Sequence, residues 1–316
     1  MAVQPSVSVV VPTFRRRDRI GAVVDRLLAQ PLHELVVVVD GSDDGTLELL
    51  RDLAVLDPRL VPVWVPNAGE GAARQTGAEH ATGDVVLFVD DDVLAGPELV
   101  AGHAARHRGL RRLVVLGYMP TAQPAPAAPD AFATVLYRLD YERRCEQYAA
   151  DPGSVLRRFW AGNFSMRRGD ALAVGLANPR YTERYHPDRE FGLRCLEHGL
   201  RGVFEPTLVA VHHHGRTLEA FRRDARSQGA GRRAIEALHG ETIDAEGEAQ
   251  LLAGLPAPLR HVVRSASRPR SYALTAGALS STVKATNRVG LPGAQLAAAR
   301  LLRRVEQVRG WKVGSA

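Results

Sequence analysis

The pattern of apolar and polar residues along the first third of the chain predicts strands that alternate with helices. Four continuous apolar runs rich in β-branched residues lie at 6–13, 35–40, 60–66 and 85–89. Three segments with helical character separate them, at 16–30, 46–56 and 69–82. Strands that are apolar throughout and alternate with helices are typical of a parallel sheet covered on both faces. The predicted fold class is therefore α/β, with a doubly wound, mostly parallel sheet.

The rest of the chain predicts fewer strands and more helix. A connector rich in Pro and Ala spans 119–130, and a helix is expected at 131–149. A strand and a helix are expected within 157–175, a short helix at 188–199 and a strand at 203–215, which ends in three histidines. From Arg216 to the end the pattern is helical. We expect a catalytic domain over 1–215, with halves at 1–118 and 131–215, and a C-terminal helical region over 216–316.

Polar side chains follow each of the first four predicted strands. They are Thr13 and Arg15, Asp40 to Asp43, Asn67, and Asp90 to Asp92. In open parallel sheets, ligands bind beyond the carboxyl ends of the strands. We therefore expect these four strand ends to form one site.

The three adjacent aspartates Asp90, Asp91 and Asp92 suggest a bound cation, because neighbouring carboxylates repel one another. Mg²⁺ and Mn²⁺ prefer oxygen ligands and are often held by one or two carboxylates plus substrate phosphates. Alternation along a strand places Asp90 and Asp92 on the same side. The alternative is that an aspartate only caps a helix, as this residue often does.

Two further groups have a functional and a structural interpretation, and the residues alone do not decide between them. In the triplet His212 to His214, alternation puts His212 and His214 on one face, where either imidazole would complete a metal site. Asp188 precedes a predicted helix and is either a helix cap or a general base. Glu190 is a second candidate for the base.

Composition and charge narrow the class of protein. No apolar run reaches the ~18–20 residues needed to span a bilayer. Cys145 and Cys195 form no metal spacing or disulfide framework, and no basic segment precedes the first apolar run. We therefore expect a cytoplasmic protein. From Arg216 on, 17 Lys and Arg stand against 8 Asp and Glu, so a basic tail follows a mildly acidic body.

Other nucleotide-binding and hydrolase motifs are missing from the sequence. The stretch GEGAARQTG lacks the full spacing of a dinucleotide-binding loop and follows the third predicted strand instead of the first. The sequence has neither a P-loop nor a Gly-x-Ser-x-Gly elbow. These observations argue against a Rossmann dehydrogenase, a P-loop ATPase and an α/β-hydrolase.

Four motifs, in this order, resemble a family 2 glycosyltransferase of the GT-A fold over roughly 6–215: VSVVVPTFRR, VVVVDGSDDGT, NAGEGAARQTGAEHATGDVVLFVDDDV and DREFGLRCLEHG. The resemblance implies a metal-dependent, inverting transfer, of the hexosyltransferase type, from a nucleotide sugar to an acceptor hydroxyl. We favour a UDP-sugar as donor and Mg²⁺ or Mn²⁺ as the cation. Polysaccharide, glycolipid or cell-envelope synthesis is the expected setting, with an acceptor that is lipid-linked or free. The first half of the catalytic domain would bind the donor and the second half the acceptor.

The resemblance also implies roles for individual residues. Asp188 would be the catalytic base. Asp40 would accept a hydrogen bond from the imide NH of the nucleotide's base. Asp92 of the Asp-x-Asp motif would bind the metal together with Asp90 and with His212 or His214. The donor would contact Pro12, Thr13, Phe14, Arg15, Asp40, Ser42, Asp43, Asn67, Gly71, Arg74, Asp90, Asp91, Gly162 and Asn163. Two positions depart from the family pattern: Gln75 replaces an Asn, and Pro187 replaces the Glu of a Glu-Asp pair.

Three other functions remain as alternatives. A non-catalytic nucleotide-sugar-binding protein would keep the same fold. A sugar-nucleotide pyrophosphorylase would need a Gly-rich loop after the first strand, and that place reads PTFRRRDRIG. Nucleic-acid binding is suggested by the basic tail, but few aromatic residues lie among its arginines, so we expect no nucleic-acid partner.

The predicted C-terminal helix at 293–312 combines apolar residues at helical spacing with interleaved arginines. A basic amphipathic helix of this kind either lies in a membrane interface or packs its apolar side on the protein. The first interpretation predicts peripheral contact with the inner face of a membrane. Both interpretations remain open from the sequence.

Overall fold

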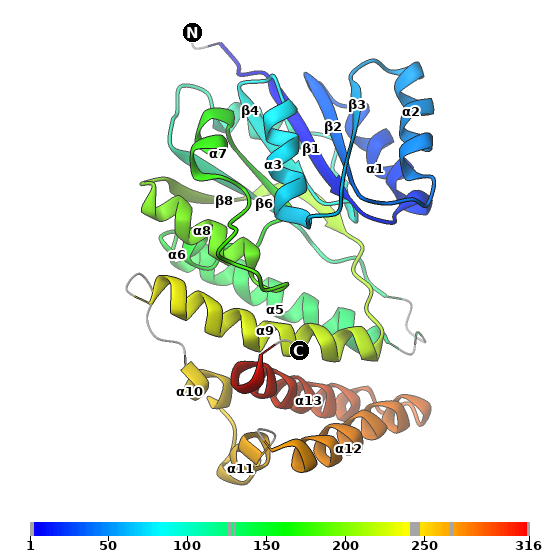
Figure 1. Ribbon diagram of the computed structural model, residues 1–316, viewed down its shortest axis with the longest axis vertical. Helices are drawn as coiled ribbons and strands as arrows, with labels where there is room; N and C mark the ends of the chain where they lie inside the picture. The colour runs from blue at the N-terminus through cyan, green and yellow to red at the C-terminus, as the bar shows by residue number, and fades with distance from the viewer. Residues whose placement is uncertain (1–2, 125–127, 129, 241–246, 266–267, 315–316) are drawn as a thin grey trace. The chain divides into compact units, whose positions relative to one another are not determined.

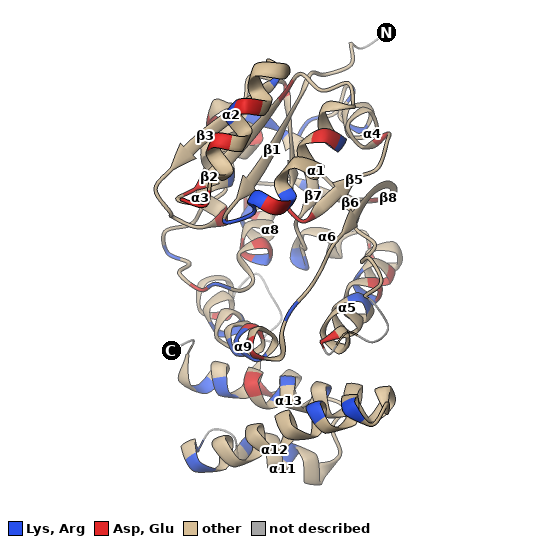
Figure 2. Ribbon diagram, turned by 90° about the vertical axis from the view of Figure 1, so that its right-hand side faces the viewer, with Lys and Arg blue, Asp and Glu red and all other residues tan. Residues whose placement is uncertain are grey.

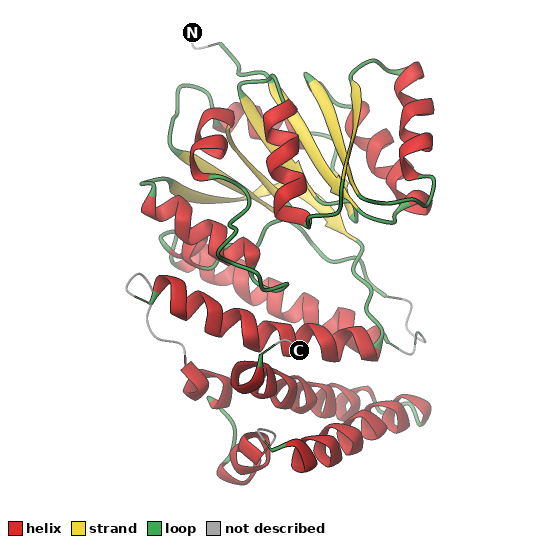
Figure 3. Cartoon of the chain, in the orientation of Figure 1, coloured by secondary structure: helices red, strands yellow, loops and turns green. Residues whose placement is uncertain are grey.

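The computed structural model describes residues 3–124, 128, 130–240, 247–265 and 268–314. The chain divides into two compact units, and each is described by itself. The first, called the sheet unit, comprises Met1–Ala122, Glu142–Pro179 and Phe191–His213. The second, called the helical unit, comprises Gln123–Tyr141, Arg180–Glu190 and His214–Ala316. Figure 3 shows the strands of the first unit and the helices of the second.

An eight-stranded mixed sheet forms the centre of the sheet unit (Figure 1), in the order β3-β2-β1-β4-β7-β6-β8-β5. Its strands are β1 Val7–Thr13, β2 Glu34–Asp40, β3 Leu60–Val65, β4 Val85–Val89, β5 Val93–Ala95, β6 Leu113–Tyr118, β7 Asn163–Arg167 and β8 Arg201–His212. The first four strands pair in parallel, as do β6 and β8, whereas β7 and β5 are antiparallel to their neighbours. The predicted α/β class with a mostly parallel sheet is confirmed.

The helices of the sheet unit form because their apolar faces are buried against this sheet. They are α1 Arg17–Leu28, α2 Thr46–Leu56, α3 Glu70–His80, α4 Leu99–Arg106, α6 Ser154–Arg157 and α7 Arg168–Val174. The apolar residues Ile20, Val23 and Leu27 of α1, spaced three and four apart, are buried as the periodicity predicted. Helix α3 packs across β1 and β2 and against α7.

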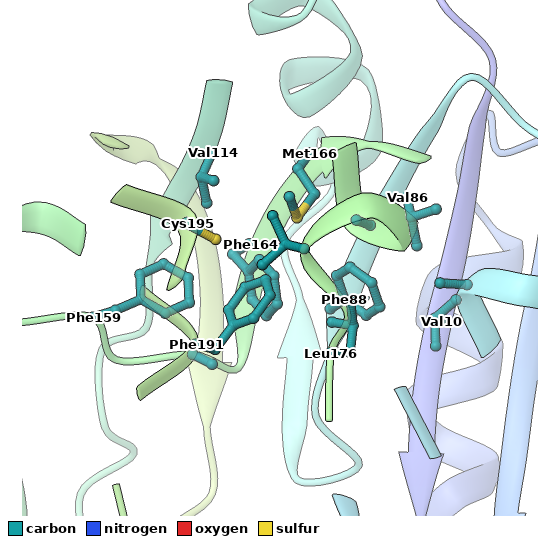
Figure 4. Packing of buried hydrophobic residues seen from close by; sticks show 14 of the residues in the cluster. Val10, Val86, Phe88, Val114, Phe159, Phe164, Met166, Leu176, Phe191 and Cys195 are labelled. Carbon is teal, nitrogen blue, oxygen red and sulfur yellow. The ribbon is translucent and has the colours of Figure 1, made fainter. Parts of the chain in front are cut away.

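Aromatic side chains fill the core between the middle of the sheet and the helices. Phe88 of β4 and Phe164 of β7 stack with ring centroids 4.7 Å apart, and Phe159 meets Phe164 edge to face at 5.1 Å. Figure 4 shows these rings grouped with Phe191. Aromatic pairs in these geometries contribute about 0.5–1.5 kcal/mol beyond their burial. The packing ties β7 to β4 and so fixes the segment that precedes β7.

The helical unit is built around α9 Leu218–His239 and α13 Pro292–Val313. It also contains α10 Gly247–Leu252, α11 Ala257–Ser265 and α12 Pro269–Arg288, whereas α5 Ala131–Ala150 and α8 Pro187–Glu197 have residues in both units. The carboxylate of Glu306 on α13 is fully buried and accepts hydrogen bonds from Arg222 at 2.7 Å, Arg226 at 3.0 Å and the Tyr272 hydroxyl at 3.0 Å. These bonds link α9, α12 and α13 around one paired charge.

The apolar side of α13 lies in the core of the helical unit. Leu302, Val305 and Val308 are completely buried, and Trp311 packs against the same cluster. The stripe that was the proposed membrane-facing surface is therefore covered by protein, and the packing interpretation of this helix holds. None of the helices in the described part of the chain combines enough length with enough apolar character to cross a membrane.

The division into units differs from the predicted domains. The expected boundary at 215 lies close to the division between His213 and His214. However, Gln123–Tyr141 and Arg180–Glu190 belong to the helical unit, so residues 1–215 do not form one continuous unit. Part of the predicted connector at 119–130, namely 125–127 and 129, lies outside the described residues.

Candidate active site

The carboxyl ends of the first four strands lie at one edge of the sheet and carry the polar residues that the sequence singled out. Thr13 pairs with Val39 in the register of β1 and β2, and Asp40 pairs with Val65 in that of β2 and β3. The Thr13 hydroxyl donates a hydrogen bond of 2.9 Å to Asp91, which follows β4. The strand ends therefore lie close together. We call the group formed by Thr13, Asp90, Asp91 and Asp92 the strand-end cluster.

Asp40 organises the loop between β3 and α3. Its buried carboxylate accepts hydrogen bonds from the backbone N–H of Ala68 at 2.8 Å, from that of Gly69 at 3.0 Å and from the Asn67 amide at 3.2 Å. Gly41, at φ +72°, approaches so closely that a Cβ there would lie 2.6 Å from the Asn67 nitrogen. Asp40 thus holds the entry to α3, and the contact with a nucleotide base stays a prediction.

The segment after β1 presents an aromatic ring and a guanidinium group to solvent. Phe14 is exposed, and the Arg15 guanidinium lies 5.2 Å from the centre of its ring. The Arg15 backbone N–H donates a 2.7 Å hydrogen bond to the hydroxyl of Ser42, and its side chain lies 4.0 Å from the exposed carboxylate of Asp43. Pro12 and Thr13 are both buried at the end of β1, and their contact with the donor stays a prediction.

Arginine side chains offset the repulsion among the three aspartates. Arg74 of α3, which is buried, donates a 2.6 Å hydrogen bond to Asp90 and also pairs with Glu70. Arg16 lies between the other two carboxylates, with 3.4 Å from its Nε to Asp91 and 3.6 Å from its Nη2 to Asp92.

Burial raises the pKa of Asp91 to about 6, although the nearby Arg16 guanidinium lowers it and the charge of Asp92 raises it further. A carboxyl whose pKa is this high sits in an environment that disfavours negative charge. An additional cation near these carboxylates would therefore stabilise their charged forms.

The structure brings one aspartate and one histidine together at this edge. Val93 pairs with His212 in the register of β5 and β8, and the Nε2 atom of His212 lies 3.3 Å from Asp92 Oδ1. In the described part of the chain, no group of three or more His, Cys, Asp and Glu side chains is gathered to hold a metal ion. Asp92 and His212 thus supply two donors, and a bound cation would take its remaining ligands from phosphate or water.

Gly162 lies directly against the cluster. Its φ of +115° is unfavourable for other residues, and a Cβ at this position would lie 2.8 Å from Asp90 Oδ2. The backbone N–H of Asp90 also donates a 3.2 Å hydrogen bond to the Gly162 carbonyl. The glycine therefore permits the close approach of this segment to the Asp90 carboxylate, and its contact with the donor stays a prediction. Gly71, predicted for the donor as well, lies in the first turn of α3.

The prediction that His214 shares a face with His212 is wrong, because β8 ends at His212 and the alternation stops there. His214 belongs to the helical unit, where its ring stacks on Tyr137 with centroids 4.2 Å apart and its Nδ1 atom lies 3.2 Å from the Thr134 hydroxyl.

The side chain of Asn163, a residue predicted to contact the donor, points into the interior, and the predicted contact stays a prediction. Asn163 is completely buried, its amide nitrogen donates a 2.9 Å hydrogen bond to the Leu208 carbonyl, and its Oδ1 lies 3.0 Å from His103 Nε2. At the first residue of β7 its side chain points into the interior, whereas Gly162 before it faces the cluster. The asparagine therefore anchors β7.

Asn163 is one end of a chain of buried hydrogen bonds that we call the histidine chain. Because Asn163 Oδ1 only accepts, His103 carries its proton on Nε2 and accepts at Nδ1 from the Ser165 hydroxyl, at 2.7 Å. His107 Nε2 then donates to the same hydroxyl, at 2.8 Å. Burial lowers the pKa of His103 to about 3 and that of His107 to about 4, so both are neutral.

Asp188 and Glu190 both lie in the first turn of α8, and their surroundings differ. Pro187 occupies the first helical position, where its missing N–H and fixed φ are favourable, which explains this departure from the family pattern. Glu190 is buried in the helical unit, with Oε1 3.4 Å from His239 Nε2. Asp188 is partly exposed. Of the two candidates for the base, Asp188 is the one that solvent reaches.

Sequence reasoning did not assign a role to Arg16, which bridges Asp91 and Asp92. The available signal was the run of three arginines directly after the first strand. The departure at Gln75 has a structural cause, since its side-chain oxygen accepts a 2.8 Å hydrogen bond from the Leu176 backbone N–H and so ties α3 to the segment after α7.

Comparison with known proteins agrees with this geometry. Residues 8–127 match the family model described as glycosyl transferase family 2. A glucosyl-dolichyl phosphate glucuronosyltransferase of Haloferax volcanii is 30% identical over 175 residues, which are 54% of this chain and 55% of that protein. The chain spans between 14% and 55% of the length of such curated relatives.

Solved structures share the fold at low sequence identity. A mannosyltransferase from Pyrobaculum calidifontis, in complex with GDP-Man and Mn²⁺, has a TM-score of 0.58 at 21% identity, covering 94% of this chain and 86% of that one. The structure of GalNAc-T7 with UDP, GalNAc and Mn²⁺ has a TM-score of 0.57 at 16% identity, covering 82% and 53%. The chain therefore has the GT-A fold that the sequence predicted.

Proposed function

We propose that this chain, whose residues 8–127 match the model of glycosyl transferase family 2, transfers a sugar from a nucleotide-sugar donor to a hydroxyl group with the help of a divalent cation. The observation that carries the proposal is the 3.3 Å approach of His212 to Asp92 within a cluster of three aspartates at the carboxyl edge of the sheet. A cluster short of positive charge, at the place where open α/β sheets bind their ligands, suits a diphosphate with its cation.

Mg²⁺ or Mn²⁺ fits the donor set of this edge, which combines carboxylate oxygens with one imidazole. Asp92 and His212 would hold the ion, and Asp90, kept in place by Arg74, would face the ribose or the ion. A cation bound there would offset the negative charge of the departing nucleoside diphosphate. The two solved relatives with Mn²⁺ support a divalent ion.

The donor nucleotide would lie against the segments that follow β1 and β2. Phe14 and Arg15 offer a flat surface and a positive charge, and Ser42 and Asp43 lie beside them. Among the solved relatives one binds GDP-Man and another UDP, so the fold is compatible with either base. We keep a UDP-sugar as the favoured donor.

Asp188 would accept the proton of the attacking acceptor hydroxyl. The hydroxyl oxygen would form a bond to the anomeric carbon while the bond from that carbon to the diphosphate oxygen breaks on the opposite face. This displacement inverts the configuration at the anomeric carbon. A partly exposed carboxylate suits a base that must meet an incoming hydroxyl, whereas Glu190 is enclosed beside His239.

The acceptor we propose is a lipid-linked or polysaccharide hydroxyl in glycolipid, polysaccharide or cell-envelope synthesis. The Haloferax relative acts on a glucosyl-dolichyl phosphate, a lipid-linked sugar, which supports this class. An enzyme with such an acceptor would work in the cytoplasm, at the inner face of a membrane.

The decisive experiment measures donor turnover and donor binding with and without metal. UDP-, GDP- and dTDP-sugars are screened by thermal shift in the presence of Mn²⁺, and the best donor is then assayed for release of nucleoside diphosphate. We expect one donor to raise the melting temperature only when Mn²⁺ is present, and EDTA to abolish both binding and turnover. Full turnover in EDTA would contradict the metal-dependent mechanism, and donor binding without turnover would favour a binding protein.

A further inference from the structure

Helix α12 in the helical unit has two faces of opposite character. Its inner face contributes Ala276 and Val283, both buried, to the apolar cluster shared with α13, and Tyr272 and Leu279 pack against the same cluster. Figures 1 and 2 both show α12 lying beside α13. The inner face accounts for the stability of the helix in this unit, and it leaves the outer face to be explained.

The outer face of α12 is a continuous row of exposed residues. Positions four, four, three, four and three apart fall on one side of an α-helix. The row consists of Arg270, Leu274, Ala278, Ser281, Ala285 and Arg288, all exposed. Its middle is apolar or small and its two ends are basic, and the exposed Lys284 lies next to it.

Large apolar side chains stand out from this face and from the turn that follows it. Leu274 is 76% exposed, Val289 is 67% exposed, and Leu291, at the start of α13, is 54% exposed. Such exposure has no role in folding the helical unit, because these side chains contribute nothing to its core. Together with the outer row they form a surface that we call the α12 surface.

The charge of this region is of one sign. Between Glu248 and Glu306 the sequence has no Asp or Glu, whereas nine Lys and Arg lie in that stretch. Lys and Arg, blue in Figure 2, recur along α12 and α13. A surface that combines protruding apolar side chains with basic residues and lacks acidic ones complements a membrane that carries anionic lipids.

A second pair of exposed apolar residues lacks the basic surroundings of the α12 surface. Val55 and Leu56, at the end of α2 in the sheet unit, are more than 80% exposed. Their charged neighbours in the sequence are Arg51, Asp52, Asp57 and Arg59, and Arg59 pairs with Asp57 at 2.7 Å, so the charges around this pair are mixed and no excess of basic residues accompanies it. The α12 surface differs because its exposed apolar side chains lie among basic residues without an acidic neighbour on the same helix.

We propose that the α12 surface docks the protein on an anionic lipid bilayer. Leu274, Val289 and Leu291 enter the headgroup region, and Arg270, Lys284 and Arg288 lie against the lipid phosphates. This assigns membrane contact to α12 and the turn after it, and not to α13, whose apolar stripe is buried. The docking is independent of catalysis and needs neither donor nor metal.

The test is co-sedimentation of the full chain with vesicles. We expect binding to vesicles of phosphatidylcholine mixed with phosphatidylglycerol, and little binding to phosphatidylcholine alone. Because each basic residue near an anionic surface adds about fivefold to the partition coefficient, the triple variant Arg270→Gln, Lys284→Gln, Arg288→Gln should bind on the order of a hundredfold more weakly. Raising the salt concentration should weaken wild-type binding, since exposed charges are screened.

A matched control separates this surface from net charge. The triple variant Arg26→Gln, Arg51→Gln, Arg111→Gln removes the same charge from exposed positions of the sheet unit, and it should bind the vesicles as the wild type does. Circular dichroism establishes that each variant is folded. Equal loss in both triple variants, or no binding of the wild type to phosphatidylglycerol vesicles, would overturn the proposal.

Leu274→Gln distinguishes a lipid surface from a second copy of the chain. It should weaken vesicle binding several-fold and leave the molar mass measured by light scattering unchanged. A wild-type dimer that this variant converts to monomer, without vesicle binding by either, would identify self-association as the role of the surface. Donor turnover in solution is measured separately, so failure of docking and failure of the proposed activity are distinguishable.

Discussion

Two polar clusters of the sheet unit solve the problem of buried polarity in different ways. The histidine chain runs through His103, His107, Ser165 and Asn163, is neutral, and ends on a backbone carbonyl. The strand-end cluster holds three carboxylates, and one of the arginines that offset them, Arg16, is about one-third exposed. In the first cluster neutral side chains hydrogen-bond to one another, with the buried Nδ1 atom of His107 left without a partner, and in the second the charge balance depends on a group that solvent reaches.

The difference indicates which cluster is structural and which is adaptable. A buried chain of neutral hydrogen bonds loses stability when a member is replaced, because the donor or acceptor that it paired with stays buried and unpaired. In the strand-end cluster Arg16 is partly exposed, so another cation replaces it near the carboxylates at lower cost. Gly162 and Asn163 join the two clusters in sequence, so the histidine chain fixes the segment that lies against Asp90.

A substitution in the strand-end cluster should have the largest effect, and this effect should be on activity. Asp92→Asn should lower donor turnover by about 10³-fold or more, because one of the two side chains proposed to hold the cation loses its charge. The free energy of unfolding, measured with urea at pH 7.5, should not fall, since the substitution also relieves carboxylate repulsion. Asp52→Asn on the exposed side of α2 serves as the control and should change neither quantity. A folded Asp92→Asn protein with normal turnover would remove Asp92 from the site.

The next effect tests the base. Asp188→Asn should lower kcat by about 10²–10⁴-fold while the thermal shift produced by donor and Mn²⁺ stays nearly unchanged, because the base acts on the acceptor and not on the donor. Glu190→Gln is the comparison, and we expect it to reduce stability more than kcat, since Glu190 is buried beside His239. If only Glu190→Gln lowers kcat, the assignment of the base is wrong.

The histidine chain should make the fold sensitive to acid. His103 and His107 have pKa values lowered from 6.5 to about 3 and about 4 in the folded state, so the unfolded chain binds protons first as the pH falls below 6.5. Stability is complete above that pH and decreases below it, by about 2 kcal/mol per histidine at pH 5. Asp91 acts in the opposite direction, because its folded pKa is raised, to about 6, and it contributes stability as the pH falls.

A difference measurement isolates the histidine contribution. In His107→Gln the side-chain amide keeps a donor for the Ser165 hydroxyl and no longer titrates. The stability gap between wild type and variant, measured by urea unfolding at pH 7.5 and pH 5, should shift by about 2 kcal/mol in favour of the variant at pH 5. A gap that is independent of pH would mean that His107 is not held neutral by burial.

The smallest effect expected concerns Arg16. Its contacts with Asp91 and Asp92, at 3.4 and 3.6 Å, are partly exposed, so Arg16→Gln should change the free energy of unfolding by less than about 1 kcal/mol. Removing a competing cation should tighten Mn²⁺ binding, measured by isothermal titration calorimetry without donor, by about fivefold. Weaker binding would show instead that Arg16 orients the carboxylates for the metal.

The sequence alone determined the α/β class, the strands β1 to β4 and the grouping of polar residues at their carboxyl ends. These features follow from local patterns: apolar runs of strand length, helical periodicity between them, and the rule that parallel strands end at one edge. The sequence pattern also predicted the 20-residue helix α5 and helix α8, which ends before Gly199. For the candidate site, the sequence predicted that the strand ends carrying Thr13, Asp91 and Asp92 lie together. The roles of these residues remain predictions.

Only the tertiary structure decided the direction in which certain side chains point. Asn163 turns inward because His103 on α4 and the Leu208 carbonyl on β8 lie there, and neither is near it in sequence. His214 leaves the face of His212 because β8 ends at His212, which pairs with Val93, the first residue of its partner strand β5. The apolar side of α13 is covered because α9 and α12 pack on it, and that leaves α12 as the surface turned outward. A local pattern specifies that a side of an element is apolar or polar, and long-range packing specifies what that side meets.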